Sequence, residues 1–211
     1  MIIIIIQKMD LKDTYNRIAA DWDNDHKDDS WWIKHSTKLI SLLPKGATIL
    51  DAGCGAGHKS KYLTNQGFKV TGIDFSEKLL EIARKNSPDT NFILMDLYDL
   101  DEFDEKFDCV FAQASLLHIP KARIMEVLQK LKDKIKPNGL LYVGVKSARP
   151  GQIEEEIMKE NDYGYEYERF FSYYTLPEMK SYFEKLGMEI ILEEVTSSGK
   201  TNWVQITGRV L

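Results

Sequence analysis

The sequence predicts one α/β domain built on a doubly wound, mostly parallel sheet with helices on both faces. The length of 211 residues suits this fold class, because α/β domains of about 200 to 250 residues are routine as single units. From residue 47 to residue 145, short apolar strands alternate with amphipathic helices. Those strands are apolar at successive positions, which is typical of strands that helices cover on both faces.

The first eight residues do not fit this pattern. Met1 is followed by five isoleucines, whereas a bilayer span needs about 20 apolar residues. A signal peptide would need a basic start and a small-residue cleavage site, and neither is present. Helical patterning begins at Met9, so we interpret residues 1–8 as a leader or an artificial extension. The alternative is an extra β-strand on an exposed edge. The domain itself is expected to span residues 9–211.

Residues 10–45 are predicted to be mainly helical. Apolar side chains recur at helical spacing between Tyr15 and Trp22. After an acidic stretch, Ser30 is expected to cap a second helix that stops before Pro44.

The central part of the chain is expected to supply the parallel sheet. Right-handed crossovers between successive strands then fix much of its topology. Strands are predicted at 47–51, 68–73, 91–95, 107–112 and 140–145, and helices at 59–66, 76–85 and 124–135.

The last third of the chain differs from the centre. Residues 150–174 form a charged connection rich in tyrosine and phenylalanine. Thr175-Leu-Pro-Glu178 is a capping box that opens a helix, and Gly187 can end that helix in a left-handed cap. Strands at 188–195 and 202–210, joined by a turn at Ser197–Gly199, predict an antiparallel pair at one edge of the sheet.

Composition narrows the possible partners. The net charge of −5 disfavours a surface built to bind phosphate backbones, so a nucleic-acid partner is not expected. Two cysteines, Cys54 and Cys109, are too few for a disulfide framework and fit the reducing cytoplasm. No apolar run of spanning length and no spacing of metal ligands occurs, so we expect a soluble cytoplasmic protein with neither a membrane partner nor a metal. Nothing in the sequence indicates the oligomeric state.

The glycine-rich segment Asp51-Ala-Gly53-Cys54-Gly55-Ala-Gly57 carries the sharpest functional signal. Glycine allows a tight turn and lets a ligand approach the backbone. The loop directly follows the first strand of the sheet, and the carboxyl ends of such strands form the ligand crevice. The sequence therefore predicts a ligand site at this loop.

The spacing of the glycines restricts the ligand. A phosphate-binding loop would need Lys and Ser or Thr directly after Gly57, and a dinucleotide fingerprint would need glycine where His58 stands. Asp74, at the end of the second strand, can accept both ribose hydroxyls of an adenosine. Asp96, after the third strand, can accept a hydrogen bond from the adenine amino group. Together with Asp51, these carboxylates would repel a pyrophosphate and suit a ligand that carries a sulfonium, an ammonium and an adenosine.

These motifs resemble those of the class I S-adenosylmethionine-dependent methyltransferases. The resemblance is carried by Ile49–Gly57, Gly72–Ser76 and Asp96, and by the later segments Phe107–Ala112 and Lys136–Leu141. It runs from about residue 10 to the end of the chain and is most specific over 47–145. It implies a seven-stranded sheet whose last strand is antiparallel, with S-adenosylmethionine as the cofactor. Residues 10–45 would then be an amino-terminal lid, and 150–174 an insertion on the acceptor side.

The resemblance also implies roles for individual residues. Gly53, Gly55 and Gly57 would approach the methionine part of the cofactor, and Asp74 would hold the ribose. The other expected cofactor contacts are Asp96 and Leu97 at the adenine, Gln113 at the methionine end, Asp51 near the ammonium, and Cys54, Phe75 and Tyr15.

The chemistry expected at this site is methyl transfer to a small-molecule acceptor. His118 follows the fourth strand and is a weak candidate for a catalytic base, with a loop-packing role as the alternative. The acidic runs could favour a cationic acceptor or be solvated faces, and the aromatic residues of 163–174 could line the acceptor site or pack on the sheet edge. A non-catalytic cofactor-binding protein and, less well supported, an NAD-dependent oxidoreductase remain as alternative functions.

Overall fold

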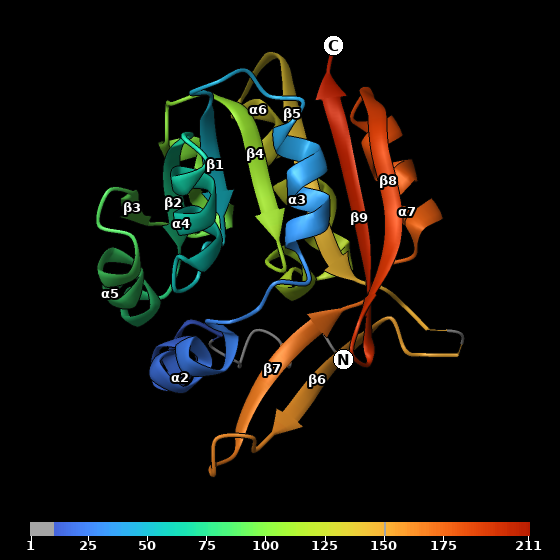
Figure 1. Cartoon of the computed structure of the whole chain (residues 1–211). Helices are drawn as coiled ribbons and strands as arrows, with labels where there is room; N and C mark the ends of the chain where they lie inside the picture. The colour runs from blue at the N-terminus through green and yellow to red at the C-terminus, as the bar shows by residue number, and fades with distance from the viewer. Residues whose placement is uncertain (1–10, 150) are drawn as a thin grey trace.

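The computed structural model describes residues 11–149 and 151–211 (Figure 1). Its main sheet has seven strands in the order β3-β2-β1-β4-β5-β9-β8. Strand β9 runs antiparallel to both of its neighbours, and the pairings among β1 to β5 are parallel. The predicted fold class and the antiparallel edge pair are therefore confirmed. The strands are β1 (Thr48–Ala52), β2 (Lys69–Asp74), β3 (Asn91–Leu94), β4 (Phe107–Gln113), β5 (Ile135–Lys146), β8 (Met188–Ser198) and β9 (Thr201–Val210).

Helices cover both faces of this sheet. On one face, α3 (Ile33–Ile40) and α4 (His58–Asn65) pack on buried side chains of β1, β4 and β5. On the other face lie α6 (Ile124–Asp133) and α7 (Leu176–Lys185). The strand order reverses between β1 and β4, and a crevice is expected at the carboxyl ends of the strands at such a switch point.

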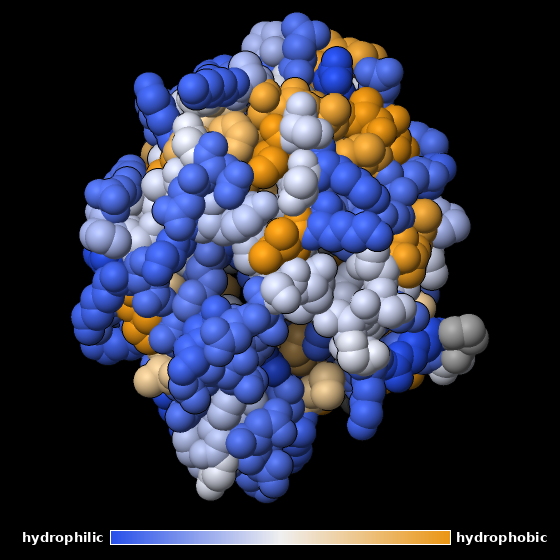
Figure 2. Space-filling model, viewed as in Figure 1, coloured by the Kyte–Doolittle hydropathy of each residue, from blue (hydrophilic) through white to orange (hydrophobic). Residues whose placement is uncertain are grey.

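Helix α2 (Leu11–His26) lies below the carboxyl ends of the parallel strands rather than on the sheet (Figure 1). Its buried side chains, Tyr15, Ile18 and Ala19, pack against α5 (Glu77–Asn86) and against Tyr167. Its outward surface is hydrophilic, whereas hydrophobic residues in the same view gather nearer the region of α3 (Figure 2). The sequence pattern between Tyr15 and Trp22 thus reflects burial of one helix face.

Several local predictions are confirmed at the level of caps. Thr175 Oγ1 accepts from the Glu178 backbone and Glu178 reaches back to the Thr175 backbone, which completes the capping box. Gly187, with φ +67°, follows α7 in the left-handed conformation. The prediction for Ser30 is wrong: α3 begins after Trp32, which has helical backbone angles and no side-chain cap. The Trp32 side chain is buried, and its indole N–H donates to Asp29 O, so packing sets this helix start.

The helix predicted at 124–135 is two residues too long, and the following strand starts earlier than predicted. Strand β5 begins at Ile135, which is buried and pairs with Phe107 of β4. The register then shifts before Leu140 pairs with Cys109. Ladder pairing with β4 therefore overrides the break that Pro137 predicts.

The charged connection contains a second, two-stranded sheet that the sequence analysis did not predict. Strands β6 (Glu155–Glu160) and β7 (Tyr167–Ser172) pair antiparallel and lie beside α2 (Figure 1). A single parallel bridge between Ser147 and Tyr174 joins the end of this hairpin to the end of β5. The proposed leader, residues 1–8, lies outside the described residues.

Candidate active site

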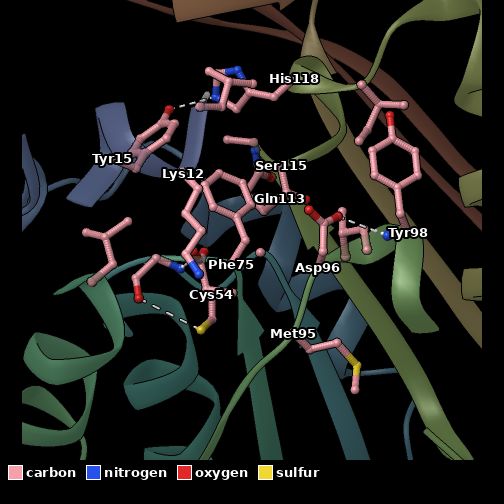
Figure 3. A pocket seen from close by; sticks show the side chains of 18 of the residues that line it. Lys12, Tyr15, Cys54, Phe75, Met95, Asp96, Tyr98, Gln113, Ser115 and His118 are labelled. Atoms are coloured by element: carbon pink, nitrogen blue, oxygen red, sulfur yellow. Dashed lines mark hydrogen bonds between the residues drawn. The ribbon is translucent and has the colours of Figure 1, made fainter. Parts of the chain in front are cut away.

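A cavity of about 470 Å³ lies where the carboxyl ends of β1, β2 and β4 meet α2 (Figure 3). All the predicted site residues line it except Asp51 and Gly57. The lining residues from that prediction are Tyr15, Gly53, Cys54, Gly55, Asp74, Phe75, Asp96, Leu97, Gln113 and His118.

The glycine loop is packed so closely that side chains would not fit. Gly53, Gly55 and Gly57 all have positive φ, between +54° and +79°. A Cβ on Gly53 would come 2.4 Å from Ser115 Cβ, and one on Gly55 would come 3.3 Å from the Trp22 ring. At Gly57 the near neighbours are Ala83 and Phe92, so this glycine serves the packing of α5 and not the cavity wall. Only two of the three glycines therefore border the ligand space.

Asp74 joins the end of β2 to the glycine loop. Its Oδ2 accepts from the Gly55 N–H at 2.9 Å, and its Oδ1 accepts from the Ser76 N–H at 2.9 Å. Burial raises the pKa of this carboxyl to about 6 despite those hydrogen bonds, and the charges of Asp51 and Asp96 raise it further. The carboxylate is thus held in one orientation at the cavity wall, with remaining lone pairs able to accept from hydroxyl groups.

Asp51 lies beneath the cavity and not in its wall. The carboxylate is 1% exposed and accepts from Ser60 Oγ at 2.6 Å. Burial raises the pKa of Asp51 to about 6, while the Ser60 hydrogen bond and the Lys59 charge lower it. The expected ring of three carboxylates around the ligand is therefore reduced to Asp74 and Asp96, because the side chain of Asp51 is directed to α4.

Asp96 and its neighbours form another part of the wall. Its carboxylate caps a short 3₁₀ helix, Leu97–Glu102, by accepting from the Tyr98 N–H at 3.0 Å. The Arg123 guanidinium lies 3.6 Å from the centre of the Tyr98 ring. Figure 3 shows Met95, Asp96 and Tyr98 on the opposite side of the cavity from Tyr15 and His118.

The end of β4 presents buried polar groups to the cavity. Tyr142 Oη contacts Gln113 Oε1 and lies 2.8 Å from Gln205 Oε1. Among the described residues, Gln113 Nε2 and Ser115 Oγ have no hydrogen-bond partner. Buried polar atoms are rarely left unpaired, so this wall fits a ligand that carries polar groups.

Tyr15 and His118 face each other across the remaining side. His118 Nδ1 lies 2.6 Å from the Phe170 carbonyl oxygen, which can only accept. The neutral ring therefore carries its proton on Nδ1, and its Nε2 accepts from Tyr15 Oη at 2.7 Å. Burial lowers the pKa of His118 to about 3, and the charges of Arg169 and Lys146 lower it further. His118 is thus a neutral hydrogen-bond acceptor at physiological pH.

Comparison with known proteins agrees with this geometry. A family model described as a methyltransferase domain matches residues 49–139. The 1,6-didemethyltoxoflavin-N1-methyltransferase of Burkholderia thailandensis, solved with its substrate and S-adenosylhomocysteine, superposes with a TM-score of 0.74 at 18% identity, over 95% of this chain and 87% of that one. Residues 49–139 therefore match a methyltransferase domain, and the fold of the chain is that of S-adenosylmethionine-dependent methyltransferases.

Other methyltransferases are similar to this chain over part or all of their length. The magnesium protoporphyrin IX methyltransferase of Synechocystis, solved with S-adenosylmethionine, gives a TM-score of 0.71 at 18% identity and 95% coverage of both chains. YqeM of Bacillus subtilis, provisionally named a methyltransferase, is 34% identical over 57% of this chain. The ubiquinone biosynthesis O-methyltransferase of Coxiella burnetii is 30% identical over 61% of it. The chain spans 49% and 58% of the lengths of these two relatives.

The structure adds cavity residues that the sequence did not indicate. They come from α2, the first turn of α4 and the loops after β3 and β4, and include Lys12, Trp22, Lys59, Tyr98, Ser115 and Arg123. No described side chain of residues 151–174 lines the cavity; Tyr163, Tyr165 and Tyr167 pack against α2 instead. Among the described residues, no helix could cross a bilayer and no group of three or more His, Cys, Asp or Glu could hold a metal.

Proposed function

We propose that this chain transfers a methyl group from S-adenosylmethionine to a small-molecule acceptor. The observation that carries the proposal is the pair of carboxylates, Asp74 and Asp96, in the wall of one cavity beside a glycine loop too crowded for side chains. The relatives and structural neighbours support it, because methyltransferases that bind S-adenosylmethionine or its product have this fold. The reducing cytoplasm is the proposed compartment, since both cysteines are free and buried.

The cavity wall offers a complementary group for each part of this cofactor. Asp74 would accept from the ribose hydroxyls, and Asp96 would accept from the adenine amino group while Leu97 packs on the ring. The methionine moiety would lie along Gly53 and Gly55, where the Gln113 amide and Ser115 Oγ each have an atom available for a hydrogen bond. When bound, the cofactor supplies an electrophilic methyl group.

The remaining task of the protein is alignment. An in-line displacement gains from fixing both reactants in one geometry, which is worth about 7–11 kcal/mol in favourable intramolecular cases. Tyr15 and His118 would border the acceptor. The attacking group of the acceptor would then replace the Tyr15 hydroxyl as the hydrogen-bond donor to His118 Nε2. Because burial lowers the pKa of His118 to about 3, its ring is a weak base, and a nucleophile that needs no deprotonation before attack suits this wall best.

The proposal is tested by binding and turnover on the whole chain. Isothermal titration should show binding of S-adenosylhomocysteine and no binding of NAD. A panel of small-molecule acceptors with O, N or S nucleophiles should then release S-adenosylhomocysteine from S-adenosylmethionine. Binding of NAD without S-adenosylhomocysteine would indicate an oxidoreductase. Binding of S-adenosylhomocysteine without turnover on any acceptor would favour a non-catalytic cofactor-binding protein.

A further inference from the structure

Lys59 differs from the other basic side chains of the cavity. Lys12 lies 2.9 Å from Glu77, and Arg123 forms two hydrogen bonds with Glu126. Lys59, in the first turn of α4, also lines the cavity. Among the described residues, its ammonium has no hydrogen bond and no carboxylate within 4 Å, and its marked contact is the Trp32 ring, with Nζ 5.8 Å from the ring centre. This leaves one cation of the wall without an anion.

The lack of a paired anion is unfavourable for Lys59, because its ammonium is partly removed from water. Loss of hydration lowers the pKa of its ammonium, and the charges of Asp51 and Asp29 only partly oppose the shift. Asp51 already accepts from Ser60 and does not line the cavity. A charge taken out of water is stabilised by a paired counter-charge, so an anion entering from the cavity would complete the site.

The position of Lys59 in the fold says which part of a ligand it would meet. Asp74 and Asp96, which suit hydroxyl and amino groups, follow β2 and β3. Lys59 lies on α4, directly after the loop that carries Gly53 and Gly55, and it lines the cavity together with both glycines. The cavity thus has carboxylates at the ends of β2 and β3 and an unpaired cation beside the glycine loop of β1.

We propose that Lys59 binds the α-carboxylate of the methionine moiety of S-adenosylmethionine. The proposal rests on the proposed function and adds a cation to a site where the sequence motifs supply only glycines, amides and acids. Trp32 holds the lysine from the side away from the cavity: its indole N–H is bound to Asp29 O, and its ring faces Lys59. The α4 amino terminus adds a partial positive charge next to the same carboxylate.

The test compares ligands that differ by the carboxylate alone. Wild-type protein, Lys59→Met and the control Lys61→Met, an exposed lysine of the same helix, are titrated with S-adenosylhomocysteine and with its decarboxylated analogue. A charge-assisted hydrogen bond predicts that wild-type protein prefers S-adenosylhomocysteine by roughly 10- to 100-fold. Lys59→Met should lose that preference and bind the decarboxylated analogue within about twofold of wild type. Lys61→Met should behave as wild type.

Other outcomes contradict the proposal in distinguishable ways. If Lys59→Met weakens both ligands equally, Lys59 supports the loop and does not recognise the carboxylate; Lys59→Gln and a melting curve check that the variant is folded. If Lys59→Met binds S-adenosylhomocysteine as tightly as wild-type protein does, Lys59 does not bind the cofactor's carboxylate, and the proposal is wrong. If wild-type protein binds neither ligand nor 5′-methylthioadenosine, the proposed function itself fails. Binding of all three without preference overturns only the role of Lys59.

Discussion

Asp74 has two tasks within one side chain. The same carboxylate that faces the cavity also receives the Gly55 and Ser76 N–H groups. Loss of the side chain would therefore disturb the glycine loop as well as the ligand site. Comparing Asp74→Asn with Asp74→Ala therefore separates the effect of losing the charge from the effect of losing the side chain.

Replacing Asp74 by Asn or by Ala should weaken cofactor binding. Ala should destabilise the glycine loop more than Asn, because Asn leaves one of the two backbone N–H groups without an acceptor and Ala leaves both. Asp74→Asn keeps an acceptor oxygen and should cost about 1.5–3 kcal/mol of S-adenosylhomocysteine binding, the range for hydrogen bonds to a charged group. Asp74→Ala should also lower the free energy of unfolding by about 1–3 kcal/mol, because two backbone donors lose their partner. Titration calorimetry and urea denaturation measure the two effects. Unchanged affinity in both variants would remove Asp74 from the ligand site.

The raised pKa of Asp74 predicts a pH dependence with opposite signs for binding and for stability. Because the native carboxyl has a pKa of about 6, above its usual 3.8, the folded state holds its proton more tightly. Its contribution to stability therefore falls as pH rises from about 4 to about 6. Affinity for S-adenosylhomocysteine should change the other way and weaken below about pH 6, since the protonated carboxyl is a poorer acceptor. Titrations between pH 5 and 8 test this, and Asp74→Asn should flatten the profile.

Tyr15 is the contact between the lid helix and His118. Tyr15→Phe removes the only hydroxyl that donates to His118 Nε2 among the described residues, and a buried acceptor left unpaired costs about 1–3 kcal/mol of stability. Tyr62→Phe is the matched control, because its hydroxyl makes a 3.2 Å contact with Thr37 in an exposed setting and should cost less than about 0.5 kcal/mol. Equal effects of the two changes on the denaturation midpoint would contradict the assigned hydrogen bond.

At the scale of elements, local signals in the sequence were sufficient where neighbours in the chain decide the structure. The capping box at Thr175 and the left-handed Gly187 are of this kind. The local signals did not predict the structure correctly where contacts between residues distant in the sequence determine it. Trp32, which is buried against Tyr62 and Lys59, sets the start of α3 in place of Ser30. Pairing with β4 draws Ile135 into a strand.

The candidate site shows the same division. Motifs contiguous in the sequence predicted the glycine loop and Asp74 at the cavity, because the strand and the turn after it fix their place. Trp22 and Lys59 reach the cavity only because α2 and α4 pack where they do, and no local pattern marks them. Asp51 belongs to the same motif but does not line the cavity, because its side chain is directed to Ser60.

The β6–β7 hairpin escaped prediction because charged residues occupy its buried face. Arg169 is paired with Glu160 across the two strands by hydrogen bonds of 2.6 Å, and both side chains are less than 15% exposed. Arg169 Nη1 also lies 3.4 Å from Tyr15 Oη. The ion pair thus takes the place that an apolar pair would have in an ordinary hairpin.

Breaking this pair should be far more destructive than breaking an exposed pair on the same hairpin. Arg169→Met leaves the Glu160 carboxylate buried without a counter-charge, which costs about 3–5 kcal/mol. Lys159→Met removes the exposed partner of Glu168, 3.5 Å away, and should cost at most about 1 kcal/mol. The double variant Arg169→Met/Glu160→Gln should recover part of the loss. Thermal denaturation of the four proteins tests this, and equal effects of the two single changes would show that Glu160–Arg169 is not a buried pair in solution.

At the scale of the whole molecule, α2 and the hairpin form one cover over the carboxyl edge of the sheet. Tyr165 Oη donates to Asp21 Oδ2 at 2.7 Å, and the Arg17 guanidinium lies 4.5 Å from the centre of the Tyr165 ring. The cover meets the core at Asn16, whose Oδ1 accepts from Ser76 Oγ and from the Lys78 N–H. Of these two elements, α2 lines the cavity and the hairpin does not. His118 also lines the cavity and is bound to the Phe170 carbonyl of β7, so a ligand would act on the hairpin through α2 and His118.

This arrangement predicts how protection from hydrogen exchange spreads when the ligand binds. Closed sites favour aligned displacement, and covers that close them open and shut on slow timescales. Adding S-adenosylhomocysteine should raise protection first at the glycine loop and the Asp74 turn, and then over 12–30, because α2 borders the ligand. Protection should also rise over 151–174, although no described side chain there touches the cavity, because Tyr165 and Arg169 tie the hairpin to α2. The amides of β8 and β9 at the far edge serve as the internal control and should not change.

The variant Tyr165→Phe tests whether the hairpin gains protection through its contacts with α2 or through a general decrease in the mobility of the protein. Tyr165→Phe removes the hydrogen bond to Asp21, which lies in an exposed setting far from the ligand space. It should leave the affinity for S-adenosylhomocysteine and the protection of α2 close to wild type, yet reduce the gain over the hairpin, because one of the two ties is cut. If ligand protects only the loop and the Asp74 turn in the wild-type protein, α2 and the hairpin are ordinary packing elements and do not form a cover that responds to the ligand. If the hairpin gains protection equally in the variant, the hydrogen bond to Asp21 does not carry the coupling, and the contacts of Arg17 with the ring of residue 165 and of Arg169 with Tyr15 are sufficient.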